Sequence, residues 1–547
     1  MQHEPAQLAF MPEEALIRQP ILDYQKVRAE YHAGRMDTAH FRMNRIQMGI
    51  HLQRPPSTRY MVRVKIPYGL LSANQLRTLA TMVPANAPDQ HITTRQAVEL
   101  HDIPPDTEME LLEHLAAVGL TTWEAGGNSV RNVVGCPLLG TCPWQAVDAV
   151  SATRCLVRSF LGSPATEALP RKLKVAVSGC SQDCAAARLQ DIGLVATRLD
   201  GAPGFRVYVG GGIGATPMVG VPLAFFVPQS AVVPFVGAVA DVFNQRGTRI
   251  LRHRARLKWL VAEVGEVEFR RMVRTAYSAK SRLPVEWTTD QSQISSIYSS
   301  FPPSAPVSWA RPLNVDATWV ERRLWPEQNG RWAMVLTWPG GSLTSRQAQL
   351  VADWADTYGN GMLSTTTLQQ LVIHGISETH GPALIDVLMR VEPNQVRSTT
   401  TVVSCPGAPY CNLAITRSGA LARVVAEVAE RVAEGNQAVR LTPAVIRICG
   451  CPHACSHVRF ADLGLMGGAA KIGSSMIPVY RLWLGGREDQ EMPERGVATV
   501  RIPARRVPQA IERLFRAYAA DALKGESFGA WARRYFMPEG DQRGMNS

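Results

Sequence analysis

The segment Cys405-Pro-Gly-Ala-Pro-Tyr-Cys411 is followed, after 39 residues, by Cys451-Pro-His-Ala-Cys455. The first half of the chain repeats this pattern, with the pair Cys136–Cys142 followed after 37 residues by the pair Cys180–Cys184. Eight of the ten cysteines therefore belong to two copies of one motif. Two short-spaced pairs of thiolates are the soft, anionic ligands that a cubane iron–sulfur cluster requires. The motif predicts a [4Fe–4S] cluster in at least one copy.

Two other uses of these cysteines fit less well. Zinc sites with four cysteines usually separate paired ligands by about two to four residues, whereas the first pair of each copy encloses five residues and begins with Cys-Pro. Disulfide frameworks serve small secreted domains that cannot build a core. A chain of 547 residues is long enough to bury several cores.

The composition is that of a large intracellular enzyme, with 46% hydrophobic and 19% charged residues. No apolar run approaches the roughly 18 residues that read as a transmembrane helix. The N-terminus lacks the basic start and apolar run of a secretory signal. Because cluster assembly needs reduced thiols, the sequence predicts a cytoplasmic protein without a membrane segment.

The net charge of +12 favours encounter with acidic partners. Nucleic acid is not predicted, because the charge is spread and no recognised nucleic-acid motif appears. The glycine-rich stretch from Gly210 lacks the G-x-G-x-x-G spacing of a dinucleotide site. Electrons must therefore arrive from another protein, and we expect an acidic donor such as a ferredoxin or a flavoprotein reductase.

The duplication extends beyond the cysteines. Four landmarks recur at offsets of 272, 273, 269 and 271 residues, namely Pro67 with Pro339, His101 with His374, Cys136 with Cys405, and Asp191 with Asp462. A nearly constant offset indicates a duplicated unit of about half the chain. The proline-rich stretch at 301–312 is typical of a linker.

Each half is predicted to be α/β. Residues 60–66 alternate as a strand with Val62 and Val64 on one face. A helix follows with Ser72 as its N-cap, then a strand at 98–104 and a helix at 106–120 that ends at Gly119. Strand–helix–strand–helix is half of a ferredoxin-like sandwich. The predicted segments are an N-terminal extension at 1–57, ferredoxin-like half-domains at 58–122 and 316–390, cofactor-binding domains at 123–300 and 391–547, and a linker at 301–315.

Read in order, MVRVKIP, ITTRQ, GGNSVRNVVGCP, LPRKLK, CPGAPYC, CGCPHAC and the closing GESFGAWARRY resemble the siroheme- and [4Fe–4S]-dependent sulfite and nitrite reductases. The resemblance covers the chain from about residue 40 onward. It implies a pseudo-twofold α/β fold in which each half joins a ferredoxin-like half-domain to a siroheme and Fe–S domain. It also implies six-electron reduction of sulfite to sulfide, or of nitrite to ammonia, at a siroheme that shares a cysteine thiolate with the cluster.

The resemblance assigns roles to individual residues. Cys405, Cys411, Cys451 and Cys455 correspond to the cluster ligands, with Cys455 as the bridge to siroheme. The cations that bind the substrate anion correspond to Arg63, Arg131, Lys172 and Lys174. Cations for the eight siroheme carboxylates correspond to Arg95 and Arg171, and Arg54 is a further candidate.

The chemistry of these cations can be argued independently. Arginine is a fixed anion clamp, and lysine can also donate protons to departing oxygens. The strand period places Lys172 and Lys174 on one face, so that their ammoniums converge.

Two features depart from the family pattern. The first-half set Cys136, Cys142, Cys180 and Cys184 is intact, yet the positions of Arg63 and Arg95 become Val335 and Leu368 in the second half. We expect one catalytic siroheme plus a second cluster, with or without an inactive tetrapyrrole; four cysteines without metal are the alternative. His453 lies inside the last cysteine pair, either bonding cluster sulfur or serving as a spacer.

The leading prediction is a siroheme sulfite reductase. Nitrite reductases of the family often carry Asn at the position of Lys174, so this lysine favours sulfite, and nitrite reduction is the alternative. A cluster-only electron carrier or a precorrin-modifying relative is the alternative from another class, and it would not need the four anion-binding cations.

Overall fold

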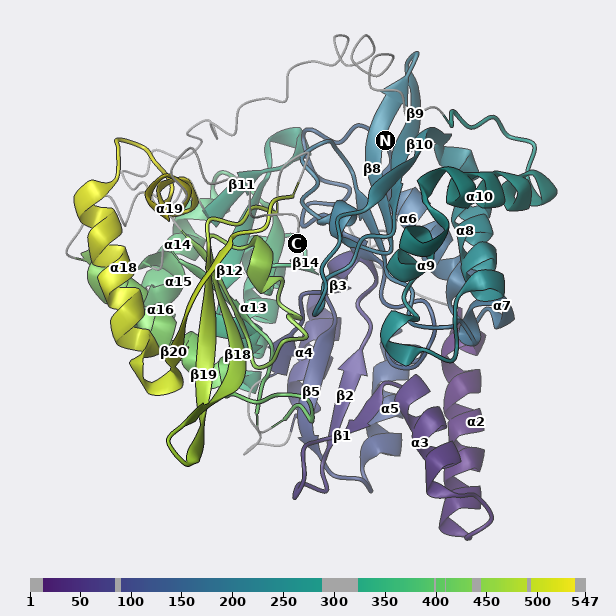
Figure 1. The fold of residues 1–547 in the computed structure, drawn as a ribbon, viewed down its shortest axis with the longest axis horizontal. Coiled ribbons are helices and arrows are strands. Elements are labelled where there is room, and N and C mark those ends of the chain that lie inside the picture. The colour runs from purple at the N-terminus through teal and green to yellow at the C-terminus, as the bar shows by residue number, and fades with distance from the viewer. Residues whose placement is uncertain are drawn as a thin grey trace.

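The computed structural model describes residues 13–83, 90–287, 323–397, 400–408, 410–434, 444–488 and 493–536. The linker predicted at 301–315 lies outside them. The described chain forms four five-stranded sheets with helices packed against them, which confirms the predicted α/β class (Figure 1). None of the described helices is both long and apolar enough to cross a membrane.

The first ferredoxin-like sheet has the order β1-β2-β5-β4-β13. Its strands are β1 (Ile50–Leu52), β2 (Tyr60–Val64), β5 (Val98–Ile103), β4 (Gln90–Ile92) and β13 (Ser342–Leu343), and its helices are α4 (Ala73–Thr81) and α5 (Glu108–Ala117). The residues before it form α2 (Glu14–His32) and α3 (Thr38–Gln47). Helix α2 packs on α5, where Arg28 pairs with Glu108 at 2.7 Å.

The second ferredoxin-like sheet has the matching order β11-β12-β15-β14-β3. Its strands are β11 (Leu324–Pro326), β12 (Trp332–Thr337), β15 (Gln370–Ile376), β14 (Met362–Thr365) and β3 (Leu70–Ser72), and its helices are α13 (Ser345–Tyr358), α14 (His380–Val391) and α15 (Pro393–Arg397). Each sheet therefore takes its last strand from the other half. This exchange confirms the predicted pseudo-twofold arrangement and locks the halves together.

The two cysteine-bearing units each contain a mixed sheet. The first comprises β6 (Val134–Gly135), β7 (Val175–Ser178), β8 (Ile192–Leu199), β9 (Ala202–Val209) and β10 (Val221–Pro228), with α6 (Ala149–Phe160), α7 (Pro164–Glu167), α8 (Val232–Arg246), α9 (Leu257–Val264) and α10 (Glu266–Lys280). The second comprises β16 (Thr401–Ser404), β17 (Val445–Cys449), β18 (Leu463–Ile472), β19 (Ser475–Leu484) and β20 (Val497–Pro503), with α16 (Ser418–Glu434), α18 (Val507–Asp521) and α19 (Phe528–Phe536).

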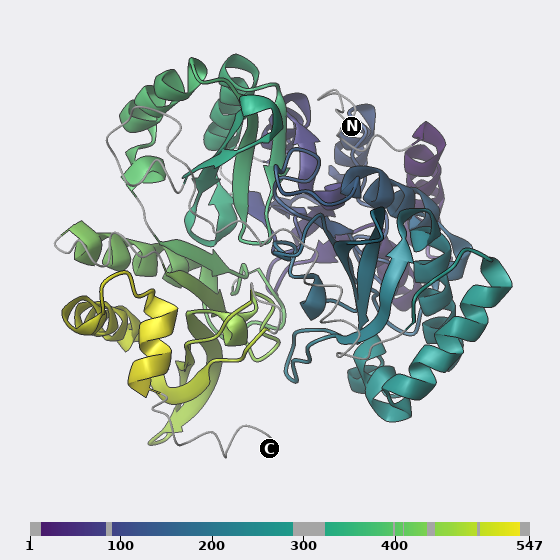
Figure 2. The same cartoon turned by 90° about the horizontal axis from the view of Figure 1, so that it is seen from above.

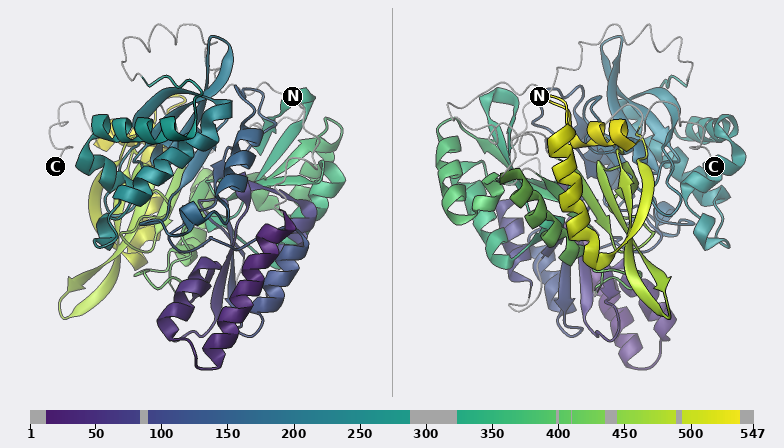
Figure 3. Two further views of the ribbon diagram at one scale, coloured as in Figure 1. Left: turned by 90° about the vertical axis from the view of Figure 1, so that its right-hand side faces the viewer. Right: turned by 60° about the vertical axis from the view of Figure 1, so that its left-hand side comes forward.

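These two units lie on opposite sides of the molecule (Figure 2). Helices α16, α18 and α19 pack against the C-terminal sheet through one apolar core, and α8 and α10 cover the outer side of the first-half sheet (Figure 3).

Local structure follows the sequence closely in the first half. In β2 and just beyond it, Val62, Val64 and Ile66 are fully buried, as their alternation predicts. Ser72 caps α4 and forms a capping box with Gln75. Gly119, at φ 75°, follows α5 where a left-handed residue ends the helix.

Candidate active site

The second-half cysteines lie at the carboxyl ends of two neighbouring strands. Cys405 follows β16 and Cys451 follows β17, and the two strands pair in parallel. Parallel strands end at the same sheet edge, so the two cysteine pairs meet there. The Gly450 amide donates a hydrogen bond to the Cys405 sulfur at 3.2 Å. A rigid backbone therefore positions this set.

The second-half sulfurs lie close enough to interact. Burial, together with the sulfurs of Cys455, Cys405 and Cys411, raises the pKa of the Cys451 thiol to about 12. Such thiols become thiolates beside the positive charge of bound metal. Within the described residues, no three His, Cys, Asp or Glu side chains are grouped for a single metal ion. A zinc ion would need all four sulfurs at about 2.3 Å from one point, whereas four thiolates in two short-spaced pairs are the ligand type of a multi-iron cluster.

Two arginines converge opposite these cysteines. Arg63, on β2, donates through Nε and Nη2 to Glu99 Oε1 at 3.0 and 2.7 Å. Its Nη1 donates to the Ala125 carbonyl at 3.1 Å. Arg131 donates to the same carbonyl at 2.9 Å and to the Gly127 carbonyl at 2.8 Å. Both guanidiniums are therefore held by the protein itself.

Lys172 and Lys174 lie immediately before β7. Leu173 between them is fully buried and bridges Val130, while the two lysines are half-buried on the other side. Burial, with the nearby Arg131 guanidinium, lowers the pKa of Lys172 to about 7, and the Cys455 sulfur opposes that shift. The charge of Lys172 thus interacts with a cysteine of the other half, and the convergence of the two lysines on an anion stays a prediction.

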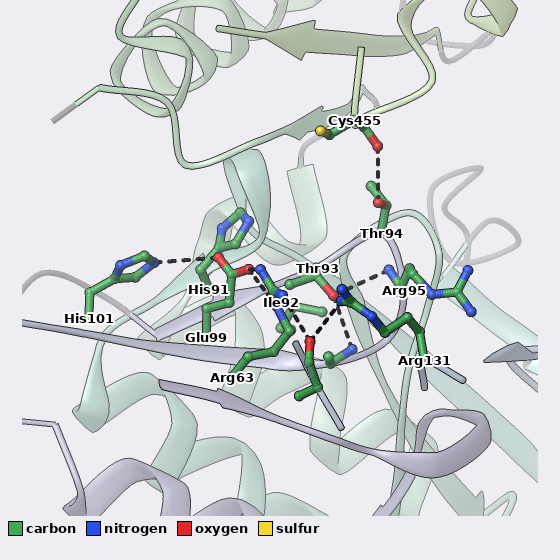
Figure 4. Close-up of polar contacts among 12 residues, drawn as sticks. Arg63, His91, Ile92, Thr93, Thr94, Arg95, Glu99, His101, Arg131 and Cys455 are labelled. Atoms are coloured by element: carbon green, nitrogen blue, oxygen red, sulfur yellow. Dashed lines mark hydrogen bonds and ion pairs between the residues drawn. The ribbon is translucent and has the colours of Figure 1, made fainter. Parts of the chain in front are cut away.

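Contacts between the halves bring Cys455 to this cationic face. The Thr94 hydroxyl donates to the Cys455 carbonyl at 3.3 Å. Burial raises the pKa of the Cys455 thiol, whereas Lys172 and Lys174 lower it. Figure 4 shows Cys455 on one side and, facing it, Thr94, Arg95, Arg131, Arg63 and Glu99.

Positive charge exceeds negative charge at this site. The cations that interact there are Arg63, Arg95, Arg131, Arg171, Lys172, Lys174 and Arg256. Among the described residues, Glu99 pairs with Arg63 and Asp191 pairs with Arg256. The buried Nε atoms of Arg95 and Arg131 have no hydrogen-bond partner in the described part of the chain. Excess charge and unpartnered buried donors fit a polyanion such as the octacarboxylate siroheme.

The other predicted siroheme cations have different surroundings. Arg95 donates to Gln190 Oε1 at 2.7 Å and to the Val175 carbonyl at 3.2 Å. Arg171 is half-buried and donates to Asn128 Oδ1 at 3.3 Å. Arg54 contacts the Cys405 loop, where its guanidinium bonds the Ala414 carbonyl. Assignment of these three to siroheme carboxylates stays a prediction.

Sequence reasoning missed a buried polar group beside the site. Glu99 lies between Arg63 and His101, whose Nε2 is 3.7 Å from Glu99 Oε2. His91 and His101 line a cavity of about 150 Å³ beside the Cys405 loop, together with Tyr410 of that loop. The signal was present: in the strand Val-Glu-Leu-His, residues 99 and 101 share a face.

The first-half cysteines are also brought together. Burial, with the sulfurs of Cys184 and Cys180, raises the pKa of the Cys136 thiol, and Cys142 shares a hydrogen bond with Cys180. None of the ten cysteines forms a disulfide. His453 approaches its neighbour Cys451, with Nδ1 at 3.6 Å from the sulfur.

Comparison with known proteins agrees with this arrangement. The profile described as "Nitrite/Sulfite reductase ferredoxin-like half domain" matches residues 51–118 and again 325–391. The profile described as "Nitrite and sulphite reductase 4Fe-4S domain" matches residues 126–281. The solved structure of the NirA protein of Mycobacterium tuberculosis is similar at a TM-score of 0.80, with 26% identity over 94% of each chain.

Relatives of both substrate types align over most of their length. The ferredoxin–nitrite reductase of Synechococcus elongatus is 29% identical over 89% of this chain and 90% of its own. A ferredoxin-type sulfite reductase of Mycolicibacterium paratuberculosis is 29% identical over 87% and 82%. The chloroplastic ferredoxin–nitrite reductase of Zea mays is 30% identical over 80% and 74%. With the family's half-domain matched once in each half, this chain belongs to the nitrite and sulfite reductase family of oxidoreductases.

Proposed function

We propose that this protein reduces sulfite to sulfide by six electrons at a siroheme coupled to a [4Fe–4S] cluster. The observation that carries the proposal is the pair Lys172 and Lys174, whose ammoniums shift the pKa of the Cys455 thiol across the interface between the halves. Arg63 and Arg131 share the Ala125 carbonyl on the same cationic face. Four cations directed at one space suit a small, doubly charged oxyanion.

When bound, the siroheme and its cluster supply the reducing electrons and an iron that holds the anion. Reduction of sulfite to sulfide releases its three oxygens as three waters and consumes six protons. Arg63 and Arg131 stay charged and hold oxyanion oxygens in place. Lys172 and Lys174 hold the same anion, and each Nζ can pass a proton to a departing oxygen.

The cluster of this site would be held by Cys405, Cys411, Cys451 and Cys455, with Cys455 nearest the cationic face. We also propose a second [4Fe–4S] cluster on Cys136, Cys142, Cys180 and Cys184. Its support is the intact motif and the mutual influence of three of those sulfurs.

Nitrite is the second candidate substrate, and the names of the Synechococcus and maize relatives favour it. Its reduction also takes six electrons but removes two oxygens and places one charge, not two, among the cations. Lys174 favours sulfite, because a second ammonium contributes more to binding the dianion.

The donor that we propose is a ferredoxin, as in the names of the relatives. Ferredoxins are acidic, and a chain of net charge +12 attracts such a partner. Because all ten cysteines stand outside disulfides, we propose that the protein works in the reducing cytoplasm.

Anaerobic assays with both substrates test the proposal. Purified protein, reduced by ferredoxin or by a viologen dye, is given sulfite or nitrite, and sulfide and ammonium are measured. We expect a higher kcat/KM for sulfite. A kcat/KM for nitrite that exceeds the sulfite value would move the assignment to nitrite reduction. Protein that assembles clusters but turns over neither anion would support a cluster-only relative.

A further inference from the structure

The two cysteine sets face different residues on the ferredoxin-like sheets opposite them. We propose that the first-half set holds a [4Fe–4S] cluster that carries no tetrapyrrole and stands as a separate redox centre. This inference rests on the second cluster of the proposed function and adds that the mirror image of the siroheme pocket is filled by the protein.

The cysteine sites themselves match closely. Three cysteines of each set receive backbone N–H···S hydrogen bonds from equivalent positions. In the first half, the amides of Gly179, Trp144 and Gln182 donate to the sulfurs of Cys136, Cys142 and Cys180. In the second half, the amides of Gly450, Leu413 and His453 donate to the sulfurs of Cys405, Cys411 and Cys451. Such bonds stabilise cluster thiolates, so both backbones are built for the same ligand.

The wall opposite the first-half set has lost its charge. In the active site, Arg63 pairs with Glu99 across strands β2 and β5. At the same register in the second ferredoxin-like sheet, Val335 pairs with Val372 across β12 and β15. Both valines are fully buried. An ion pair that faces a cofactor pocket has therefore been replaced by two apolar side chains.

A leucine fills the space next to those valines. Leu138, between Cys136 and Cys142, packs with Ala333, Val335 and Val372 in one buried apolar cluster. The equivalent position in the Cys405 loop is Gly407, where an added Cβ would lie 2.3 Å from Ser418 Oγ. The first-half loop thus projects a side chain into its facing wall where the second-half loop cannot.

Two further mirror positions also lack cations. Lys174 and Val445 are equivalent, because their amides bond Asp191 and Asp462 at 2.9 and 2.8 Å. In the second half, the position equivalent to Arg95 is occupied by Leu368. An octacarboxylate without these cations would bury uncompensated charge, which costs several kcal/mol per ion.

The second ferredoxin-like unit closes over the first-half loop. Gln328 donates through its backbone to the Thr141 carbonyl at 2.8 Å and through its side chain to the Cys142 carbonyl at 3.0 Å. Trp325 and Cys142 both pack on the Leu138 cluster. The equivalent bond at the active site joins the Arg54 amide to the Tyr410 carbonyl at 3.2 Å. The apolar filling by Leu138 and the two valines, and not this contact, is therefore what separates the two sites. The first-half cysteines remain together, and Cys184 is exposed. A cluster here can exchange electrons without a haem iron.

Stoichiometry of the wild-type protein tests the inference without a folding risk. Protein reconstituted and purified anaerobically is assayed for iron, acid-labile sulfide and extracted tetrapyrrole. One siroheme with two clusters predicts about nine irons, about eight sulfides and one tetrapyrrole per chain. On partial reduction we expect a paramagnetic cluster signal that does not couple to siroheme iron.

Each way in which the inference could fail gives a different content of iron, sulfide and tetrapyrrole. A content of about five irons and one tetrapyrrole per chain would show that there is no second cluster. About nine or ten irons with two tetrapyrroles keeps the second cluster and overturns its separateness. A single extra metal without sulfide overturns a cluster at this site.

A matched set of variants locates the extra iron. We expect Cys184→Ala to lose about four irons and keep the tetrapyrrole, and Cys455→Ala to lose the tetrapyrrole's normal spectrum. Cys155→Ala, an exposed thiol outside both sets, should change neither value. If Cys184→Ala keeps all its iron, or if it also loses the siroheme bands, the site assignment is wrong.

Discussion

The Thr94 hydroxyl of the first half donates a hydrogen bond of 3.3 Å to the Cys455 carbonyl of the second half. The cationic face and the expected bridging cysteine therefore belong to different halves and meet only in the complete fold. The exchanged strands β3 and β13 fix the two halves in this arrangement. The duplication thus produced one asymmetric site, because only one of the two possible pairings kept its cations.

Lys174→Asn removes one ammonium from the anion site but leaves the second-half cysteines unchanged. We expect the siroheme spectrum to persist and sulfite turnover to fall by about ten- to a thousand-fold, as for loss of one electrostatic or proton-donating group. Nitrite turnover should fall less. Lys26→Asn, an exposed lysine on α2, is the control. Unchanged sulfite kinetics in Lys174→Asn would place the anion site elsewhere.

Gln96 and Gln369 are a matched pair for testing how the ferredoxin-like sheets hold the two cysteine loops. Gln96 bonds both backbone groups of Gly135 and the Thr365 carbonyl, at 2.7 to 3.1 Å. Substitution by Ala removes the partner of three buried groups, so at about 1 to 3 kcal/mol per group we expect a loss of about 3 to 9 kcal/mol in the free energy of unfolding.

Gln369 makes the equivalent bonds to Ser404 and to the Ile92 carbonyl. Its alanine variant should be destabilised to a similar extent in denaturant titrations. Because Ser404 precedes Cys405, Gln369→Ala should also lower siroheme content, whereas Gln96→Ala should not. Equal siroheme loss in both variants would contradict the separate roles of the two cysteine loops.

His51 predicts a loss of stability in acid. Burial, with the Arg63 and Arg131 guanidiniums, lowers the pKa of His51 to about 3. The unfolded chain, with a pKa near 6.5, binds this proton more readily, so stability falls as pH drops from about 6.5 toward 3. We expect His51→Gln to reduce the loss of unfolding free energy between pH 7 and 5 by on the order of 1 kcal/mol. Parallel curves for both proteins would remove His51 as the cause.

The basic surface predicts salt-sensitive electron delivery. The screening length falls from about 10 Å at 0.1 M salt to about 3 Å at 1 M. Turnover driven by ferredoxin should drop steeply over that range, while turnover driven by a small viologen dye should change little. If salt lowers ferredoxin-driven and viologen-driven turnover alike, electrostatic docking of the donor does not explain the salt dependence.

Much of this arrangement could be predicted from local sequence. The alternation of Val62 and Val64 and the cap at Ser72 are short-range signals, and both have the expected structure. The constant offset between landmarks such as Asp191 and Asp462 predicted the pseudo-twofold, and the two carboxylates do bond equivalent amides.

Long-range relationships could not be predicted in the same way. Strands β3 and β13 are three and two residues long, too short for a periodic signal, so their exchange was invisible. The contact of Arg54 with the Ala414 carbonyl could not be predicted either, because it depends on how the two halves pack. In the sequence, Val335 indicates only that a cation is missing at this position. The packing of Leu138 against Val335 can be seen only in the folded chain.

The most direct test of the central claim is the absorption spectrum of anaerobically purified wild-type protein titrated with sulfite. We expect strong near-ultraviolet and red siroheme bands that shift as sulfite binds, and loss of these bands in Cys455→Ser. Iron–sulfur absorption without siroheme bands, after reconstitution with siroheme, would contradict an active site built between Lys172, Lys174 and Cys455.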